Sequence, residues 1–186
     1  MPPKVKVSKE DILQTAVEIV RREGVTALNA RTVAAALGCS TQPVFSNFAT
    51  MEELRVAVAN KATRLYDERT AREVGDGRFP PYKASGMAYI RFAKEERELF
   101  KLLFMCDRMG ETLPEDDSSF DRMTAMVQNT MGFEKDTATL FHLEMWAYVH
   151  GIATMYATKF LDLNEELVSR MLTDMYLGLR KQYETE

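Results

Sequence analysis

Four polar side chains lie close together in this sequence: Thr41, Gln42, Ser46 and Asn47. Their amide and hydroxyl groups carry both hydrogen-bond donors and acceptors, and base pairs present both kinds of group in the major groove of DNA. A glutamine amide can pair with N6 and N7 of adenine, and a threonine methyl group can contact the methyl group of thymine. We therefore expect Gln42 to be the main base-contacting residue and Thr41 to contribute beside it.

Two short helices joined by a tight turn would position these side chains. Asn29 can cap the first helix through its side-chain oxygen, and Gly38 can end it because glycine adopts the left-handed conformation without steric cost. Ser40 can cap the second helix. Val44 and Phe48 are four residues apart, so they face the same side and leave the polar residues outside. The pattern predicts a helix-turn-helix, although an ordinary helical hairpin would show the same spacing.

A wider segment, residues 8–54, resembles the DNA-binding domain of TetR-family transcriptional regulators. The matching stretches are ILQTAVEIVRREG, GVTALN, LGCS, VFSNF and MEEL. The resemblance implies that the second helix of the pair enters the major groove of double-stranded DNA. The residues expected at the DNA are Asn29, Arg31, Ser40, Thr41, Gln42, Phe45, Ser46 and Asn47, with Lys4 and Lys6 of the N-terminal tail. For the two lysines, a tail that stays in solvent is the alternative.

The sequence departs from the pattern of that family at several positions. Phe45 stands where the family often has a tyrosine whose hydroxyl reaches a phosphate, and phenylalanine cannot donate a hydrogen bond. Asn47 and Met51 stand where the family often has histidine and lysine. Because fewer groups contact phosphates, we expect lower DNA affinity and weaker salt dependence than is usual for the family.

The composition favours an all-helical protein. The 186 residues are 46% hydrophobic and 28% charged, prolines and glycines are few, and no alternating strand pattern stands out. No run of about 18 apolar residues indicates a transmembrane helix. No apolar segment of a signal peptide precedes Ser8, so we expect a cytoplasmic protein.

The charge is distributed unevenly along the chain. The net charge of −4 argues against a protein that coats nucleic acid in bulk. Residues 1–50 nevertheless carry a formal charge of +2 and the remaining residues −6. A mildly positive N-terminal region can therefore still orient toward DNA.

The expected fold is all-α with about nine helices in two domains. Residues 1–49 would form a three-helix helix-turn-helix DNA-binding domain, and residues 50–186 a helical ligand-binding and dimerisation domain. A long helix over residues 51–74 would connect them, followed by the clearest break, residues 75–81. Further helices are expected over residues 82–94, 95–107, 120–131, 135–160 and 164–183.

The segments after this break are rich in large, soft side chains, and the whole chain has twelve methionines. Ordinary core packing would explain each residue singly. Because methionine fills irregular space and adapts to varied shapes, the set favours a flexible apolar cavity for a small apolar effector, in the region where the resembling family binds effectors. The expected lining residues are Tyr89, Phe92, Phe100, Phe104, Met105, Met123, Met126, Trp146 and His150.

The last two helices have broad apolar faces, which predict a four-helix bundle formed by two subunits. A glycine in mid-helix costs about 1 kcal/mol against alanine, and close approach of another helix would explain Gly151. The arrangement of Trp146, His150 and Gly151 resembles the C-terminal domain of a TetR subgroup, the WHG type. The expected interface residues are Gly151, Met155, Leu167, Met171, Met175 and Leu179.

Other chemistry finds little support. His142 and His150, the only histidines, would lie about 12 Å apart along one helix, too far to share a metal ion. Cys39 and Cys106 form no CxxC motif, which favours packing over redox sensing. No metalloprotease, dinucleotide-binding, P-loop or nucleophile-elbow motif occurs. We therefore expect neither an enzyme nor a bound metal or cofactor.

The resemblance and these features together imply a ligand-responsive, DNA-binding transcriptional regulator. We expect a repressor that binds a near-palindromic operator as a homodimer, is released by a small apolar effector, and has no membrane partner. The alternative is a helical module that binds a small molecule or a protein without DNA, which the acidic body and the few basic residues would suit.

Overall fold

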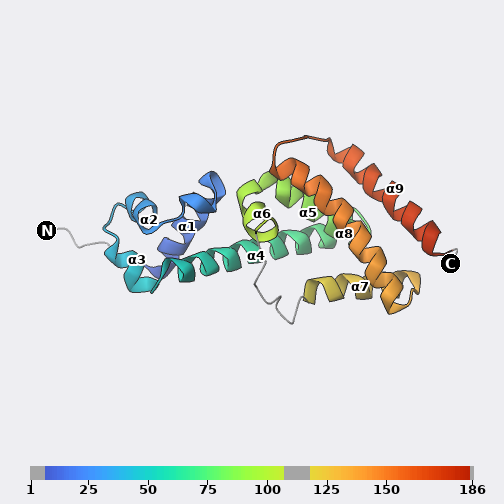
Figure 1. The fold of residues 1–186 in the computed structure, drawn as a ribbon, viewed down its shortest axis with the longest axis horizontal. Coiled ribbons are helices and arrows are strands. Elements are labelled where there is room, and N and C mark those ends of the chain that lie inside the picture. The colour runs from blue at the N-terminus through green and yellow to red at the C-terminus, as the bar shows by residue number, and fades with distance from the viewer. Residues whose placement is uncertain (1–6, 107–117, 185–186) are drawn as a thin grey trace. The chain divides into compact units, whose positions relative to one another are not determined.

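The computed structural model describes residues 7–106 and 118–184. Within these ranges it contains nine α-helices, one 3-10 helix and no strand, which confirms the predicted all-α fold (Figure 1). The elements are α1 (Lys9–Glu23), η1 (Val25–Ala27), α2 (Ala30–Ala36), α3 (Gln42–Asn47), α4 (Met51–Gly75), α5 (Pro81–Glu95), α6 (Arg97–Phe104), α7 (Ser118–Met131), α8 (Lys135–Ala157) and α9 (Glu165–Tyr183). None of the helices in the described ranges combines the length and the apolar character that crossing a membrane requires.

The helices form two compact units. Of the described residues, the first unit comprises those up to Asp67 together with Glu96–Cys106, and the second comprises Glu68–Glu95 and residues 118–184. Helix α4 therefore begins in the first unit and ends in the second, and α6 belongs with the N-terminal helices. This division differs from the boundary expected after residue 49. The expected boundary separated a DNA-binding domain from a ligand-binding and dimerisation domain. The functional division remains a prediction.

Two hydrogen bonds between Ser8 and Asp11 hold the start of helix α1. Ser8 Oγ accepts a hydrogen bond from the main-chain N–H of Asp11 at 3.1 Å, and the Asp11 carboxylate accepts one from the N–H of Ser8 at 2.9 Å. This reciprocal capping box satisfies two donors that the start of a helix leaves unpaired. Ile12, Ala16 and Val20 are fully buried on the inner face of α1, so the helix is a structural support of the first unit.

Helix α6 packs on α1 within the first unit. Arg21 Nε donates to Oε2 of Glu96, the residue before α6, at 2.7 Å. Gly24 follows α1 with a φ of +83°, and a Cβ at this position would stand 2.9 Å from the Glu98 carboxylate. Glycine therefore suits this position both by its conformation and by the close approach of α6.

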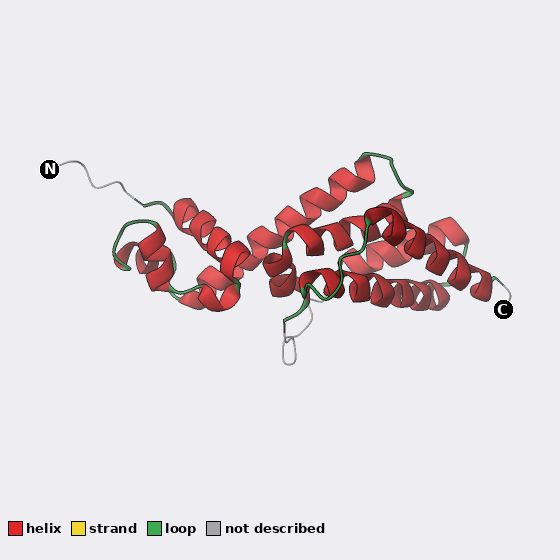
Figure 2. Cartoon of the chain, turned by 90° about the horizontal axis from the view of Figure 1, so that it is seen from above, coloured by secondary structure: helices red, strands yellow, loops and turns green. Residues whose placement is uncertain are grey.

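Helix α8 is the centre of the second unit and packs against α5, α7 and α9. The buried cluster between α7 and α8 consists of Val127, Ala138, Phe141 and Met145. A Cβ added to Gly86 of α5 would lie 3.5 Å from Val149 of α8 and 3.6 Å from Leu172 of α9. The second unit is therefore a closely packed helical bundle, and its described residues form only helices and loops (Figure 2).

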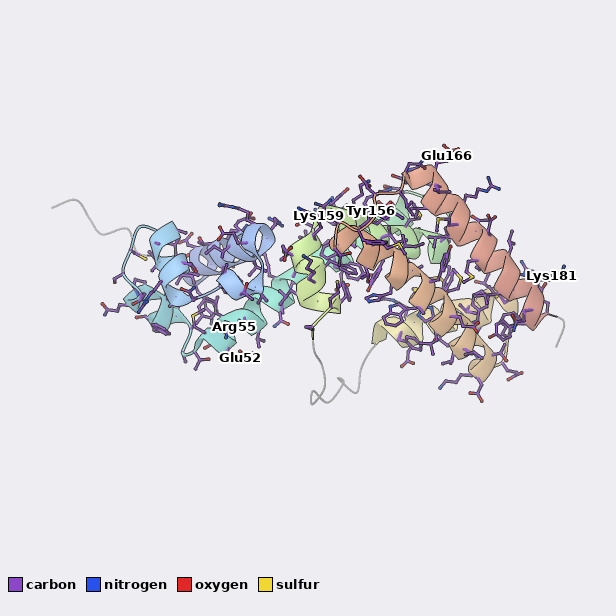
Figure 3. All side chains as sticks on the ribbon, turned by 45° about the horizontal axis from the view of Figure 1, so that its top comes forward. Glu52, Arg55, Tyr156, Lys159, Glu166 and Lys181 are labelled. Carbon is purple, nitrogen blue, oxygen red and sulfur yellow. The ribbon has the colours of Figure 1, made fainter. Side chains whose placement is uncertain are left out.

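The turn between α8 and α9 is held by local hydrogen bonds. Tyr156 Oη donates to the carbonyl oxygen of Leu163 at 2.5 Å. Lys159, labelled with Tyr156 in Figure 3, has a φ of +58°, a conformation that is uncommon outside glycine. Asn164 then caps α9, because its Oδ1 accepts from the N–H of Leu167 at 2.7 Å.

Candidate nucleic-acid interface and ligand-binding core

Helix α2 begins and ends as the sequence predicts. Asn29 Oδ1 accepts hydrogen bonds from the N–H groups of Arg31 and Thr32 at 3.0 and 3.1 Å. Thr32 Oγ1 accepts one from the N–H of Asn29 at 3.2 Å. Gly38 has a φ of +64°, and its N–H and that of the next residue return to carbonyl groups of the last turn of α2. This glycine closes the helix and turns the chain toward α3.

Helix α3 does not begin with the predicted cap. Thr41 is the N-cap residue, it already has helical dihedral angles, and its side chain makes no capping hydrogen bond. The expectation that Ser40 caps this helix is therefore wrong. Pro43 in the first turn has the fixed φ that a helix start requires. Val44 and Phe48 are each 1% exposed, so they anchor α3 in the first unit as predicted.

The polar side chains of α3 differ in how much of their hydrogen-bonding capacity is used. Ser46 Oγ donates to the carbonyl oxygen of Gln42, and Asn47 Nδ2 donates to that of Pro43, both at 2.9 Å. The Gln42 side chain is exposed, and its amide makes no hydrogen bond with a described residue. Gln42 therefore keeps both its donor and its acceptor for another molecule.

A hollow of about 500 Å³ lies beside α3 and is lined by residues from α2, α3 and their caps. The lining residues are Asn29, Ala30, Arg31, Thr41 and Phe45. The Phe45 ring is 50% exposed, and the exposed Arg31 side chain makes no ion pair with a described residue. The structure thus brings together four residues that the sequence assigned to DNA binding.

Most other basic side chains near these helices are already paired with carboxylates. The pairs are Lys9–Glu53, Arg21–Glu96, Arg22–Glu23, Arg55–Glu52 and Lys61–Glu10. Figure 3 labels Glu52 and Arg55 near the start of α4. Lys4 and Lys6 lie outside the described residues. Arg31 is therefore the basic side chain at the hollow that remains available for a phosphate.

The residues predicted to line an effector cavity fall in both compact units. Phe100, Phe104 and Met105 belong to the first unit, where the rings of Phe100 and Phe104 lie 5.1 Å apart. The second unit contains Tyr89, Phe92, Met123, Met126, Trp146 and His150. Phe92 and Phe100 are 1% and 0% exposed, as expected of ordinary core residues.

Two tyrosine–histidine pairs join α5 to α8 in the second unit. Tyr89 Oη lies 2.8 Å from His150 Nδ1, and Tyr82 Oη lies 2.9 Å from His142 Nδ1. Tyr89 and His150 were each predicted to line an effector cavity, whereas Tyr82 and His142 were not. The sequence contains an indication of the second pair, because the two tyrosines are seven residues apart and the two histidines eight. Both spacings correspond to about two helical turns. Burial lowers the pKa of both histidines and raises the pKa of Tyr82, so the second pair is uncharged at neutral pH.

The two histidines differ in their surroundings. The Trp146 ring stacks on His150 with centroids 5.2 Å apart, and Trp146 is 42% exposed. Phe120 of α7 lies with its ring 4.7 Å from that of His142, which is only 7% exposed. Thr124, one turn after Phe120, is 4% exposed, and its hydroxyl has no hydrogen-bond partner among the described residues. Among the described residues, no three His, Cys, Asp or Glu side chains are grouped so that they could hold a metal ion.

The residues predicted for a dimer interface include both packed and exposed side chains. Met175 and Leu179 pack against the buried cluster of α7 and α8 in the same chain. Met155 and Met171 are half-buried, and Leu167 is 41% exposed. Part of the predicted interface of α9 is therefore used within the chain itself.

Helix α8 has an exposed apolar face, as its sequence predicts, and the large residues on it lie outside the predicted set of interface residues. Leu140, Leu143 and Trp146 are 47%, 45% and 42% exposed. Gly151 is exposed on the same helix, and a Cβ there would meet no atom of the described residues within 4 Å. Close approach of a helix from the same chain therefore does not explain this glycine.

The helix-turn-helix, together with a second helical bundle, defines the class of protein, a two-domain helix-turn-helix protein. A family model described as the tetracyclin repressor-like C-terminal domain matches residues 82–175. The chain belongs to the TetR family of ligand-responsive transcriptional regulators, a family of transcription factors rather than enzymes.

Solved structures with the same fold cover nearly the whole chain. A protein of unknown function from Rhodococcus sp. RHA1 is 22% identical with a TM-score of 0.73, over 98% of this chain and 98% of that one. A TetR-like transcriptional regulator from Rhodococcus sp. RHA1 is 15% identical with a TM-score of 0.67, over 100% and 98%. The multidrug binding protein EbrR, complexed with imidazole, is 18% identical with a TM-score of 0.59, over 90% and 93%. No curated protein sequence gave a match.

Proposed function

We propose that the protein is a dimeric repressor that binds a near-palindromic operator and is released from it by a small ligand. The observation that carries this proposal is the α3 surface, where the unengaged Gln42 amide lies beside the hollow formed by Asn29, Arg31, Thr41 and Phe45. A short helix with free polar side chains, next to groups that can hold the sugar–phosphate backbone, is the arrangement that a major-groove reader requires.

The proposed contacts with DNA are of two kinds. Some recognise base edges, and the others contact the sugar–phosphate backbone and fix the position of the protein on the DNA. Gln42 reads an adenine through its amide, and Thr41 contacts a thymine methyl group. The backbone is contacted by Asn29, Arg31, Ser40, Phe45 and Asn47. Ser46 uses its hydroxyl proton within α3, so it contributes at most an acceptor to the DNA.

Dimerisation uses the exposed apolar face of α8 together with exposed residues of α9. Leu140, Leu143 and Trp146 expose large apolar surface, and the missing side chain of Gly151 would let a helix of the second copy come close. Leu167 and the half-buried Met155 and Met171 extend this surface. Two copies related by a two-fold axis would place two α3 helices on the two half-sites of a palindrome.

The ligand binds in the second unit and shifts the equilibrium between two conformational states of the dimer. Support comes from the partly buried tyrosine–histidine pairs and the methionines there, and from the likeness to EbrR, a multidrug binding protein. The ligand favours a state in which the two α3 helices no longer match the half-site spacing. A useful response needs a coupling free energy of about 1–3 kcal/mol between ligand and DNA.

Two observations favour a second candidate function. The basic side chains around α1 and α4 are largely paired with carboxylates, and Phe45 lacks a hydroxyl group. A helical module that binds a small molecule or a protein without DNA would have the same features.

Fluorescence anisotropy with random-sequence DNA and then with a selected site, across a salt series, distinguishes the two functions. The repressor proposal expects selective binding of two subunits per site, and release on addition of ligand. Gln42→Ala is expected to cost about 1–3 kcal/mol and to relax the preference at one base pair. Absence of selectivity even at low salt would favour the binding module.

A further inference from the structure

A buried hydroxyl group on α7 has no hydrogen-bond partner in the described part of the chain. Thr124 is 4% exposed, and its Oγ1 meets no donor or acceptor among the described residues. Thr130, on the same helix, donates instead to the carbonyl oxygen of Met126 at 2.7 Å, as threonines in helices commonly do. Because an unpaired buried hydroxyl lowers stability, Thr124 is a candidate for contact with a ligand.

A second unused donor follows from the pairing of Tyr82 with His142. Both side chains are neutral at pH 7, because burial raises the pKa of the tyrosine and lowers that of the histidine. The phenol has no other acceptor among the described residues, so it donates its proton to His142 Nδ1 at 2.9 Å. A neutral imidazole that accepts at Nδ1 carries its own proton on Nε2. His142 therefore has an N–H that no described residue accepts.

Thr124 and His142 belong to the same contact between α7 and α8. Phe120 precedes Thr124 by one helical turn, and its ring lies 4.7 Å from that of His142. Val127, three residues after Thr124, belongs to the buried cluster with Phe141, the neighbour of His142 in the chain. Residues three and four apart share one face of a helix, so the face that carries Thr124 is the face that packs against α8 around His142.

The surroundings of these two donors are uncharged and deformable. The rings of Phe141 and Tyr176 lie 6.4 and 6.2 Å from that of Tyr82, and the described contacts of Tyr82 and His142 include no lysine or arginine. The half-buried Met123 and Met126 flank Thr124 on α7, and methionine adapts to varied shapes. A carboxylate brought here would lose its hydration without a cation to compensate. A neutral carbonyl oxygen has no charge that requires a cation, so hydrogen bonds from the two donors are sufficient for it.

We propose that the ligand of this protein is an uncharged, largely apolar molecule with a carbonyl oxygen that accepts hydrogen bonds from the Thr124 hydroxyl and from Nε2–H of His142. This inference rests on the proposed function, because it names the chemistry of the ligand that the second unit binds. It narrows the expected apolar effector to ketones and similar neutral carbonyl compounds.

Two probes of similar shape test the role of the carbonyl group, 2-acetylnaphthalene and 2-ethylnaphthalene. Binding to the full-length protein is measured by NMR titration of its methionine methyl groups. We expect the ketone to bind about tenfold more tightly than the hydrocarbon, as two modest hydrogen bonds would give. Thr124→Val keeps the shape of the side chain, removes one donor and lowers this preference to about threefold. Thr130→Val, the same change on the same helix, leaves the preference unchanged.

Nitrogen-15 NMR of the imidazole tests the second donor without any ligand. The expected state of His142 at neutral pH has Nδ1 bare and Nε2 protonated, and a His142→Gln variant assigns the resonances. A proton on Nδ1 would overturn the proposal. Equal affinity for the two probes, binding of neither at millimolar concentration, or an unchanged preference in Thr124→Val would also overturn it.

The two proposals fail in different ways. Selective operator binding together with equal probe affinities would contradict only the carbonyl inference. A preference for the ketone without selective DNA binding would contradict the repressor and leave a carbonyl-binding module.

Discussion

Arg21 of α1 and Glu96, the residue before α6, form a hydrogen-bonded ion pair in which Nε and Oε2 are 2.7 Å apart. The side chains are 31% and 8% exposed, so the carboxylate is largely shielded from solvent. Helix α1 also packs against α2 and α3. The pair therefore ties α6 to the helix on which the helix-turn-helix rests.

Arg21→Ala is expected to lower the free energy of unfolding by about 1.5–3 kcal/mol, since it removes a hydrogen bond between charged groups from a buried carboxylate. Urea unfolding followed by circular dichroism measures the change. Arg22→Ala is the matched control, because Arg22 is the next residue and its side chain is 74% exposed. Its effect should stay within about 0.5 kcal/mol. Equal effects of the two substitutions would mean that the ion pair contributes nothing to stability.

Phe45→Tyr is expected to strengthen binding to DNA by about two- to tenfold, because the added hydroxyl can donate to a phosphate. The ring is 50% exposed at the hollow beside α3, so the hydroxyl has room. Phosphate contacts carry no sequence information, so random and selected DNA should gain by the same factor in anisotropy titrations. A gain confined to one sequence would show that this position reads a base instead.

The stability of the protein is expected to fall as the pH drops below about 6.5, the ordinary pKa of histidine. Burial lowers the pKa of His142 and His150 in the folded state. The unfolded chain therefore binds protons first on acidification, and stability is lost as the pH falls through this range. Thermal melts between about pH 7.5 and 5.5 should show a steeper loss for the unchanged protein than for a His142→Gln, His150→Gln double variant. Parallel curves would exclude the two histidines as the cause.

Leu143→Glu is expected to convert dimers to monomers, because it places a charge in the exposed apolar face of α8. Leu143 is 45% exposed in the single chain, so the substitution should leave the fold of the protomer intact. Sedimentation velocity measures the outcome. Val56→Glu on α4, at a site that is 52% exposed, is the control and should leave the dimer unchanged. A dimer that survives Leu143→Glu would exclude this face as the interface.

Local features of the fold could be predicted from the sequence because neighbouring residues determine them. The capping box of Ser8 and Asp11 and the cap of Asn29 join residues within three positions of each other. Gly38 ends α2 for a reason that lies in its own backbone. The local error concerned the cap of α3. Serine is a residue type that can cap a helix, but α3 begins after Thr41, which is already helical and makes no side-chain capping hydrogen bond.

Contacts between distant segments could not be predicted in this way. Arg21 and Glu96 are 75 residues apart, and no periodicity links α1 to α6. Helix α9 has apolar residues on more than one side, so spacing alone did not show that Met175 and Leu179 pack inside their own chain. The second tyrosine–histidine pair was missed for a related reason. Helical periodicity identifies residues that share a face, but it does not identify the face that packs opposite them.

The lone tryptophan gives the molecule a built-in optical label. Trp146 stacks on His150 and is partly open to solvent. An imidazolium ring quenches indole emission more strongly than neutral imidazole does, and an indole that leaves water emits at shorter wavelength. The intensity of its fluorescence should therefore report the protonation of His150. Its emission wavelength should report the binding of another molecule over this part of α8. Both can be measured in unlabelled protein.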